Sequence, residues 1–196
     1  TDGESVRVWD TDSGALQRTI TVRELKLKAL AVAADGARLL WAGEGAPPQV
    51  VELETGRPIL SFQRHPGFVS ALAIAPDGRR ALAGGSDRVV RLWDLETGQL
   101  VQSFTGHREA VTSVAISADS ATGASGSLDG TVRLWDLEDG REVCVFEGHR
   151  GKVNAVLFAG PRGDVVSAGE DRAVHLWDGW GRRPRATLAG HGHGIT

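Results

Sequence analysis

The sequence predicts an all-β protein built from a 42-residue unit that repeats along the chain, with four short antiparallel strands in each unit. Three observations lead to this fold class. Trp-Asp pairs recur in one register, beginning at Trp9, Trp93, Trp135 and Trp177, and the last three lie 42 residues apart. Short segments rich in β-branched residues alternate with turn sequences such as Asp129-Gly130. No window of eleven or more residues shows the apolar spacing of an amphipathic helix.

The unit at 106–147 shows the expected strands most clearly. We expect strand a over Val111–Ser117, strand b near Thr122–Ser125, strand c over Thr131–Trp135 and strand d over Glu142–Phe146. Turn residues separate these four segments. A sheet of four short strands cannot bury both of its faces alone, so the sheets of neighbouring units must pack against each other.

The rest of the chain follows from this unit by steps of 42 residues. In chain order, the expected segments are a half unit with strands c and d at 1–21, a degenerate unit at 22–63, regular units at 64–105, 106–147 and 148–189, and the start of a further unit at 190–196. In the degenerate unit, Val51-Glu52 stands where the others have Trp-Asp. An apolar residue closes strand d in every unit, at Ile20, Phe62, Phe104, Phe146 and Leu188.

A second pair of residues recurs in step with Trp-Asp. It is Gly-His, at Gly106-His107, Gly148-His149 and Gly190-His191. Gly-His followed by Trp-Asp at this spacing resembles the WD-repeat β-propeller, in which each four-stranded sheet is one blade. The resemblance covers essentially the whole chain. It implies that the 196 residues form an incomplete arc of about 4.5 blades from a larger ring of the seven-bladed type.

The resemblance also implies a role for the recurring polar residues. In this family a buried hydrogen-bonded tetrad links an Asp of the b–c turn, the His of Gly-His, a Ser or Thr of strand b and the Trp of strand c. The matching positions here are Asp129, His107, Ser125 and Trp135; Asp171, His149, Ser167 and Trp177; and, without a hydroxyl, Asp87, His65 and Trp93. In the third set Ala83 takes the Ser position, so we expect that hydrogen-bond chain to be broken or bridged by water.

Composition and charge exclude several classes of protein. The net charge of -3 and the pI near 6.1 argue against a nucleic-acid binder. The longest apolar run, 29–34, is far too short to span a bilayer, so we expect no membrane partner. The single cysteine, Cys144, excludes an internal disulfide, and together with the lack of a signal peptide it favours a cytoplasmic location.

The resemblance implies a function in protein–protein interaction. Propellers of this family act mainly as rigid platforms that bind other proteins or peptides through loops on a top face, which the d–a and b–c connections form. The side chains expected in those loops are Phe68, Ser86, Arg108, Glu109, Leu128, Arg150, Lys152 and Glu170. An exposed Phe beside Arg residues is a plausible binding hot spot. Further partners are the remaining blades of a longer parent chain or a second copy of this one, since an open arc exposes its end blades.

Other functions compete with the scaffold. Ser, His and Asp also make a nucleophilic triad, but here they recur once per unit and no oxyanion-hole motif accompanies them. The turns of DLETGQLVQSF and DLEDGREVCVF resemble those of quinoprotein-type propellers, and a lactonase-like propeller is a second enzymatic alternative. A third is a regulatory segment of a larger signalling enzyme. His191 and His193 suggest a metal pair only weakly, so we expect no cofactor, no metal and no catalytic residue.

Overall fold

The computed structural model describes residues 5–22, 26–44, 46–63, 65–160, 163–179 and 184–195. Within these ranges the chain forms only strands and turns. A two-stranded sheet comes first, and we call it blade 1; it pairs β1 (Ser5–Trp9) with β2 (Leu16–Thr21). Among the described residues there is no helix of the length and apolarity needed to cross a membrane.

Four four-stranded antiparallel sheets follow, each with its strands in sequence order. Blade 2 contains β3 (Leu27–Val32), β4 (Arg38–Gly43), β5 (Ala46–Glu52) and β6 (Pro58–Ser61). Blade 3 contains β7 (Val69–Ile74), β8 (Arg80–Gly85), β9 (Val90–Asp94) and β10 (Leu100–Phe104). Blade 4 contains β11 (Val111–Ile116), β12 (Thr122–Ser127), β13 (Thr131–Asp136) and β14 (Glu142–Glu147). Blade 5 contains β15 (Val153–Ala159), β16 (Asp164–Gly169), β17 (Ala173–Trp177) and β18 (Pro184–Ala189). The predicted all-β fold class of four-stranded antiparallel sheets in series is confirmed.

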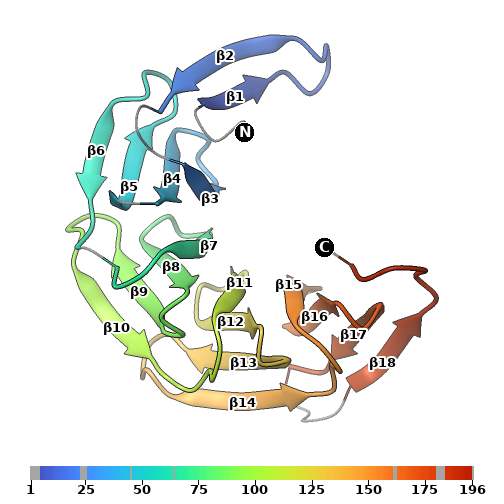
Figure 1. Ribbon diagram of the computed structural model, residues 1–196. Coiled ribbons are helices and arrows are strands. Elements are labelled where there is room, and N and C mark those ends of the chain that lie inside the picture. The colour runs from blue at the N-terminus through green and yellow to red at the C-terminus, as the bar shows by residue number, and fades with distance from the viewer. Residues whose placement is uncertain are drawn as a thin grey trace.

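The blades stand side by side in a curved row (Figure 1). The first strand of each four-stranded blade lies on the inner side of the curve and the last strand on the outer side. The row is open between blade 1 and blade 5. Consecutive turns therefore alternate between two faces of the arc: the d–a and b–c connections make the top face, and the a–b and c–d turns make the bottom face.

The hydrophobic core consists of layers between neighbouring blades. The layer between blades 3 and 4, for example, contains the buried side chains of Leu82, Val111 and Trp135. In the layers between blades 2 and 3, 3 and 4, and 4 and 5, the aromatic ring that closes strand d of one blade packs on the Trp of the next blade. Phe104, for example, lies 5.3 Å from Trp135 between ring centroids. The equivalent pairs are Phe62 with Trp93 at 5.3 Å and Phe146 with Trp177 at 4.7 Å. Each blade thus needs its neighbour to bury its apolar face.

The last member of the apolar column differs from the others. Leu188 is 65% exposed, whereas Phe104 and Phe146 are buried. The reason is that the side of blade 5 on which Leu188 lies has no blade packed against it among the described residues. A large apolar residue at the same register position is therefore core in one blade and surface in another.

The inner strands are also linked from blade to blade by hydrogen bonds. Ser70 Oγ donates to the carbonyl of Val111 at 2.6 Å, and Thr112 Oγ1 donates to the carbonyl of Val153 at 2.5 Å. At the same register position, Asn154 Nδ2 donates to the carbonyl of Ile195. The segment after β18 therefore returns to the inner strand of blade 5, where Ile195 occupies the place that Val111 and Val153 hold in the preceding blades.

Blade 2 forms the same sheet without the recurring motif. Its tryptophan, Trp41, lies on β4 at the position that Ser125 and Ser167 occupy in blades 4 and 5, and it packs in the layer between blades 1 and 2. Trp41 Nε1 is buried without a hydrogen-bond partner. Blade 2 has no tetrad, and Trp41 contributes to its packing through burial of the indole ring.

Candidate functional site

The polar residues that recur in blade 4 form one continuous chain of hydrogen bonds. Trp135 Nε1 donates to Ser125 Oγ at 2.8 Å, and Ser125 Oγ lies 2.8 Å from His107 Nε2. His107 Nδ1 lies 3.0 Å from Asp129 Oδ2. An indole N–H can only donate and a carboxylate can only accept, so the chain runs from Trp through Ser to a neutral His protonated on Nδ1.

Blade 5 repeats this arrangement. Trp177 Nε1 donates to Ser167 Oγ at 2.8 Å, Ser167 Oγ lies 2.7 Å from His149 Nε2, and His149 Nδ1 lies 3.0 Å from the Asp171 carboxylate. The side chains of His107 and His149 are almost completely buried. Burial is the largest influence on His107 and lowers its pKa, which favours the neutral ring that the chain requires.

The tetrad Asp residues also hold the top-face loops in place. Asp129 Oδ2 accepts the backbone N–H of Arg108 at 2.9 Å, and Asp171 Oδ2 accepts that of Arg150 at 3.0 Å. Burial alone would raise the pKa of Asp129, but hydrogen bonds from Thr131 and from the backbone of Arg108 outweigh it and lower the pKa to about 2. Each Asp therefore ties a b–c turn to the d–a loop beside it.

Blade 3 lacks the hydroxyl, and its polar chain is rearranged. Trp93 Nε1 and His65 Nδ1 are both buried without a hydrogen-bond partner. Arg91 Nη1 lies 2.6 Å from Asp87 Oδ2 and 2.8 Å from His65 Nε2, so the guanidinium takes the place between Asp and His. Burial, which outweighs the nearby Asp87, lowers the pKa of His65 to about 4. The hydrogen-bond chain stops at Ala83.

Neither complete Ser–His–Asp set presents a nucleophile. Ser125 and Ser167 are fully buried, and each Oγ already accepts an indole N–H. A catalytic serine needs its oxygen exposed to the substrate and an oxyanion site beside it. The geometry of these sets suits a structural chain of hydrogen bonds.

The structure brings the expected top-face residues together in three groups, one per blade. In blade 3, Ser86 Oγ accepts the backbone N–H of Phe68 at 3.1 Å, and the Phe68 ring is 49% exposed. In blade 4, the backbone of Leu128 bonds to the loop that carries Arg108 and Glu109, and its side chain is 44% exposed. In blade 5, Glu170 Oε1 lies 3.8 Å from Lys152 Nζ, beside the exposed Arg150.

Sequence reasoning missed two exposed cations on the same face, Arg88 and Arg172. Each directly follows a tetrad Asp and adopts a positive φ, of 69° and 66°, where blade 4 has Gly130 at 79°. Arg88 Nη1 also donates to the carbonyl of Arg108 at 3.3 Å, which links the top loops of blades 3 and 4. The register column 88, 130, 172 carries the signal for both, because it directly follows the tetrad Asp in blades 3 to 5.

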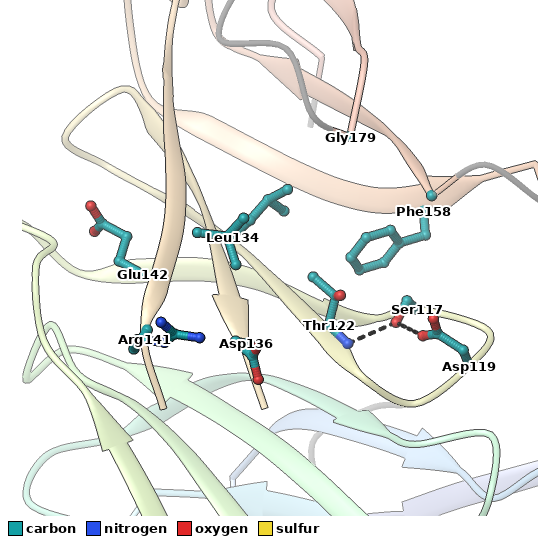
Figure 2. Close-up of a pocket in the computed structure, with 11 residues that line it drawn as sticks. Ser117, Asp119, Thr122, Leu134, Asp136, Arg141, Glu142, Phe158 and Gly179 are labelled. Atoms are coloured by element: carbon teal, nitrogen blue, oxygen red, sulfur yellow. Dashed lines mark hydrogen bonds between the residues drawn. The ribbon is translucent and has the colours of Figure 1, made fainter. Parts of the chain in front are cut away.

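A cavity of about 590 Å³ opens on the bottom face between blades 4 and 5 (Figure 2). In blade 3, Arg80 spans the corresponding interface and donates to the carbonyls of Ser120 at 2.7 Å and Leu137 at 3.2 Å. One unit later Thr122 replaces Arg80 and Gly179 replaces Leu137, and both line the cavity. Two shortened side chains at one interface thus account for the space.

Two of the acidic groups around this cavity, Asp119 and Asp136, are engaged in turns, and Glu142 pairs with Arg133. Asp119 accepts the hydroxyl of Ser117 at 2.5 Å (Figure 2). It also accepts the backbone N–H of Ala121 at 3.0 Å. Asp136 Oδ1 accepts two backbone N–H groups of its own turn. Hydrogen bonds from Ser117 and from the backbone lower the pKa of Asp119. These two aspartates shape the bottom turns, and they are not arranged as an acid–base pair.

Comparison with known families agrees with the geometry. The model of the WD domain, G-beta repeat (WD40) matches residues 56–94, 98–136 and 140–178, which is more than half of the chain. The chain belongs to the WD40 repeat family. Each matched WD40 stretch begins at a turn glycine before strand d and ends at Asp94, Asp136 or Asp178, so a WD40 repeat supplies strand d of one blade and strands a to c of the next. No curated protein matches the chain.

Proposed function

We propose that this WD40 chain is a scaffold for protein interactions, and that it binds an acidic, apolar-anchored segment of a partner through the top face of blades 3 to 5. WD40 domains commonly mediate protein interactions. The observation that carries the proposal is the composition of the exposed side chains in these loops. Two large apolar side chains, Phe68 and Leu128, stand among cationic groups that outnumber the exposed acidic ones, Glu109 and Glu170. The cations are Arg88, Arg108, Arg150, Lys152 and Arg172.

The chemistry of this face fits that partner. An apolar side chain that is half-exposed and fixed by its backbone can act as an anchor for a partner side chain. Cationic groups around it attract carboxylates and raise the rate of encounter. Because the tetrad Asp residues hold the backbone of the loops, little conformational entropy is lost when a partner binds.

A peptide library tests the proposal. The probes are fluorescent peptides rich in Asp and Glu with one Leu or Phe, and binding is measured by fluorescence anisotropy. For the tightest peptide, the double variant Phe68→Ala/Arg108→Ala should weaken binding at least tenfold, because it removes an apolar anchor and a cation while the backbone N–H of residue 108 remains. Added salt should weaken the wild-type complex as well.

Arg141→Ala is the matched control, because Arg141 is an exposed arginine on the bottom face. This variant should bind the peptide as the wild type does. Equal affinities for the wild type and the top-face variant, or a loss in Arg141→Ala alone, would place the binding surface elsewhere.

A further inference from the structure

Three side chains able to ligate a metal ion converge beside the tetrad of blade 5. His149, Asp171 and His175 each offer one ligand atom, and these atoms all lie within 4.8 Å of one another. The Asp171 carboxylate lies 3.0 Å from His149 Nδ1 and 3.8 Å from His175 Nε2. Ligand atoms of a tetrahedral zinc site, with bonds of about 2.0–2.1 Å, lie roughly 3.3 Å apart. Shifts of about 1 Å would bring the three atoms around one ion.

His175 is a buried residue with an unused ligand atom. It is only 6% exposed, and its Nε2 is buried with no hydrogen-bond partner. Its other ring nitrogen, Nδ1, lies 2.9 Å from Thr187 Oγ1, and its ring meets the His149 ring edge-on with centroids 4.4 Å apart. A histidine that ligates metal through one nitrogen is usually held through the other by a hydrogen bond. Thr187 holds His175 in that way.

The residue type at this position departs from the neighbouring blades. Blades 3 and 4 have Arg91 and Arg133 at the position of His175. In blade 3 the guanidinium of Arg91 balances the tetrad carboxylate of Asp87 at 2.6 Å. In blade 5 that guanidinium is absent, and a second imidazole faces the Asp171 carboxylate instead.

We propose that His149 Nδ1, an Asp171 carboxylate oxygen and His175 Nε2 form a binding site for a divalent transition-metal ion such as Zn²⁺. Two imidazoles and one carboxylate are a donor set that zinc accepts, with a fourth position left for water. On binding, the proton of His149 moves from Nδ1 to Nε2, where it donates to Ser167 Oγ, so the link between these two residues is kept. The ion then joins Asp171 to both rings, in place of the direct Asp–His hydrogen bond.

Zinc titration of the tag-free chain tests the site. Zn²⁺ is added in competition with a chromophoric chelator, and we expect one ion per chain and a rise in the melting temperature, since the ion binds only the folded site. His175→Arg is the decisive variant because it restores the residue of blades 3 and 4. It should fold and lose at least tenfold in zinc affinity. His175→Gln, which removes the imidazole without adding a charge, serves if the arginine variant does not fold.

The control removes the exposed histidines outside the cluster, in the double variant His191→Ala/His193→Ala. It should keep the wild-type zinc affinity. Nitrogen NMR of the imidazoles should show shifts at His149 Nδ1 and His175 Nε2 when zinc is added. Unchanged affinity in the His175 variants, a loss in the His191/His193 variant, or no binding by the wild type would overturn the proposal. Peptide binding at the top face is a separate readout and does not depend on this result.

Discussion

At the scale of single residues, blade 3 differs from blades 4 and 5 in having Ala83 at the position of the tetrad serine. Blades 4 and 5 have Ser125 and Ser167 at this position, and their hydroxyls join the indole to the imidazole. In blade 3 the indole N–H of Trp93 and one nitrogen of His65 remain buried and unpaired. An unpaired buried polar group costs about 1–3 kcal/mol. Blade 3 therefore carries a local defect that one hydroxyl can repair.

We expect Ala83→Ser to raise the free energy of unfolding by about 1 kcal/mol, because the new hydroxyl pairs with Trp93 Nε1 and the His65 ring. Urea unfolding monitored by tryptophan fluorescence measures the change. In a Trp93→Phe background, where no indole N–H needs a partner, the gain from Ala83→Ser should be smaller. A gain that is equal in both backgrounds, or absent, would contradict this explanation.

His65 also makes stability depend on pH. Its pKa is about 6.5 in the unfolded chain and about 4 in the fold, because burial disfavours the charged ring. As the pH falls below 6.5, the unfolded chain takes up the proton first, so stability is fully present above pH 6.5 and is lost progressively down to pH 4.

The melting temperature should therefore fall between pH 7 and pH 4.5 in the wild type, and it should fall less in His65→Gln, which cannot titrate. His191→Ala, which removes an exposed ring, should keep the wild-type pH dependence. The same pH dependence in His65→Gln and the wild type would show that other groups cause it.

At the scale of strands and blades, the bottom cavity depends in part on the register column of Arg80 and Thr122. Arg80 crosses from blade 3 to blade 4 and bonds two backbone carbonyls there, whereas Thr122 is too short to reach blade 5. Thr122→Arg should fill the cavity and raise the free energy of unfolding by about 1 kcal/mol. Thermal or urea unfolding measures this change. Thr122→Lys is the control and should gain less, since an ammonium lacks the forked donors of a guanidinium. An unchanged or lower stability of the arginine variant would contradict the role assigned to this column.

Most strand positions could be predicted from the sequence. The strands are segments rich in β-branched residues between turns, and the 42-residue period predicts their positions in every unit. This holds for blade 2 as well, although its Trp41 lies on strand b and the Trp of blades 3 to 5 lies on strand c. The local sequence predicts strand b near Thr122–Ser125, and in the structure β12 continues to Ser127. The backbone pairing with Val111 extends it, and that pairing is not visible in local sequence.

The candidate site was predictable to a similar extent. The resemblance to the WD-repeat family implies the tetrad residues, and the 42-residue period assigns them to the same positions in blades 4 and 5. Arg88 and Arg172, which directly follow a tetrad Asp, were not among the predicted top-face residues. The cavity depends on which side chains of blade 4 meet those of blade 5. The contact of His175 with Asp171 lies within blade 5 and depends on how the b–c turn folds onto strand c. Such contacts are set by packing, which the sequence encodes only through the whole fold.

At the scale of the whole molecule, blade 5 exposes an apolar face. Leu157 and Leu188 are 50% and 65% exposed, while Leu134 and Phe146, on the same side of blade 4, are buried by blade 5. We expect the 196-residue chain by itself to associate through this face at micromolar concentration, because exposed apolar faces of sheets pair readily. Sedimentation velocity measures this, and Leu188→Glu should shift the chain towards the monomer. A monomer of 20.8 kDa over the whole concentration range would contradict the expectation.

We propose above that partners bind the top-face loops of blades 3 to 5. Hydrogen–deuterium exchange of the wild-type chain, with and without the tightest acidic peptide, tests it most directly. We expect slower exchange in the top-face loops at 66–68, 86–88, 105–110, 128–130, 148–152 and 170–172, with the bottom turns at 117–121 and 136–141 unchanged. Protection of those bottom turns, with the top loops unchanged under saturating peptide, would contradict it.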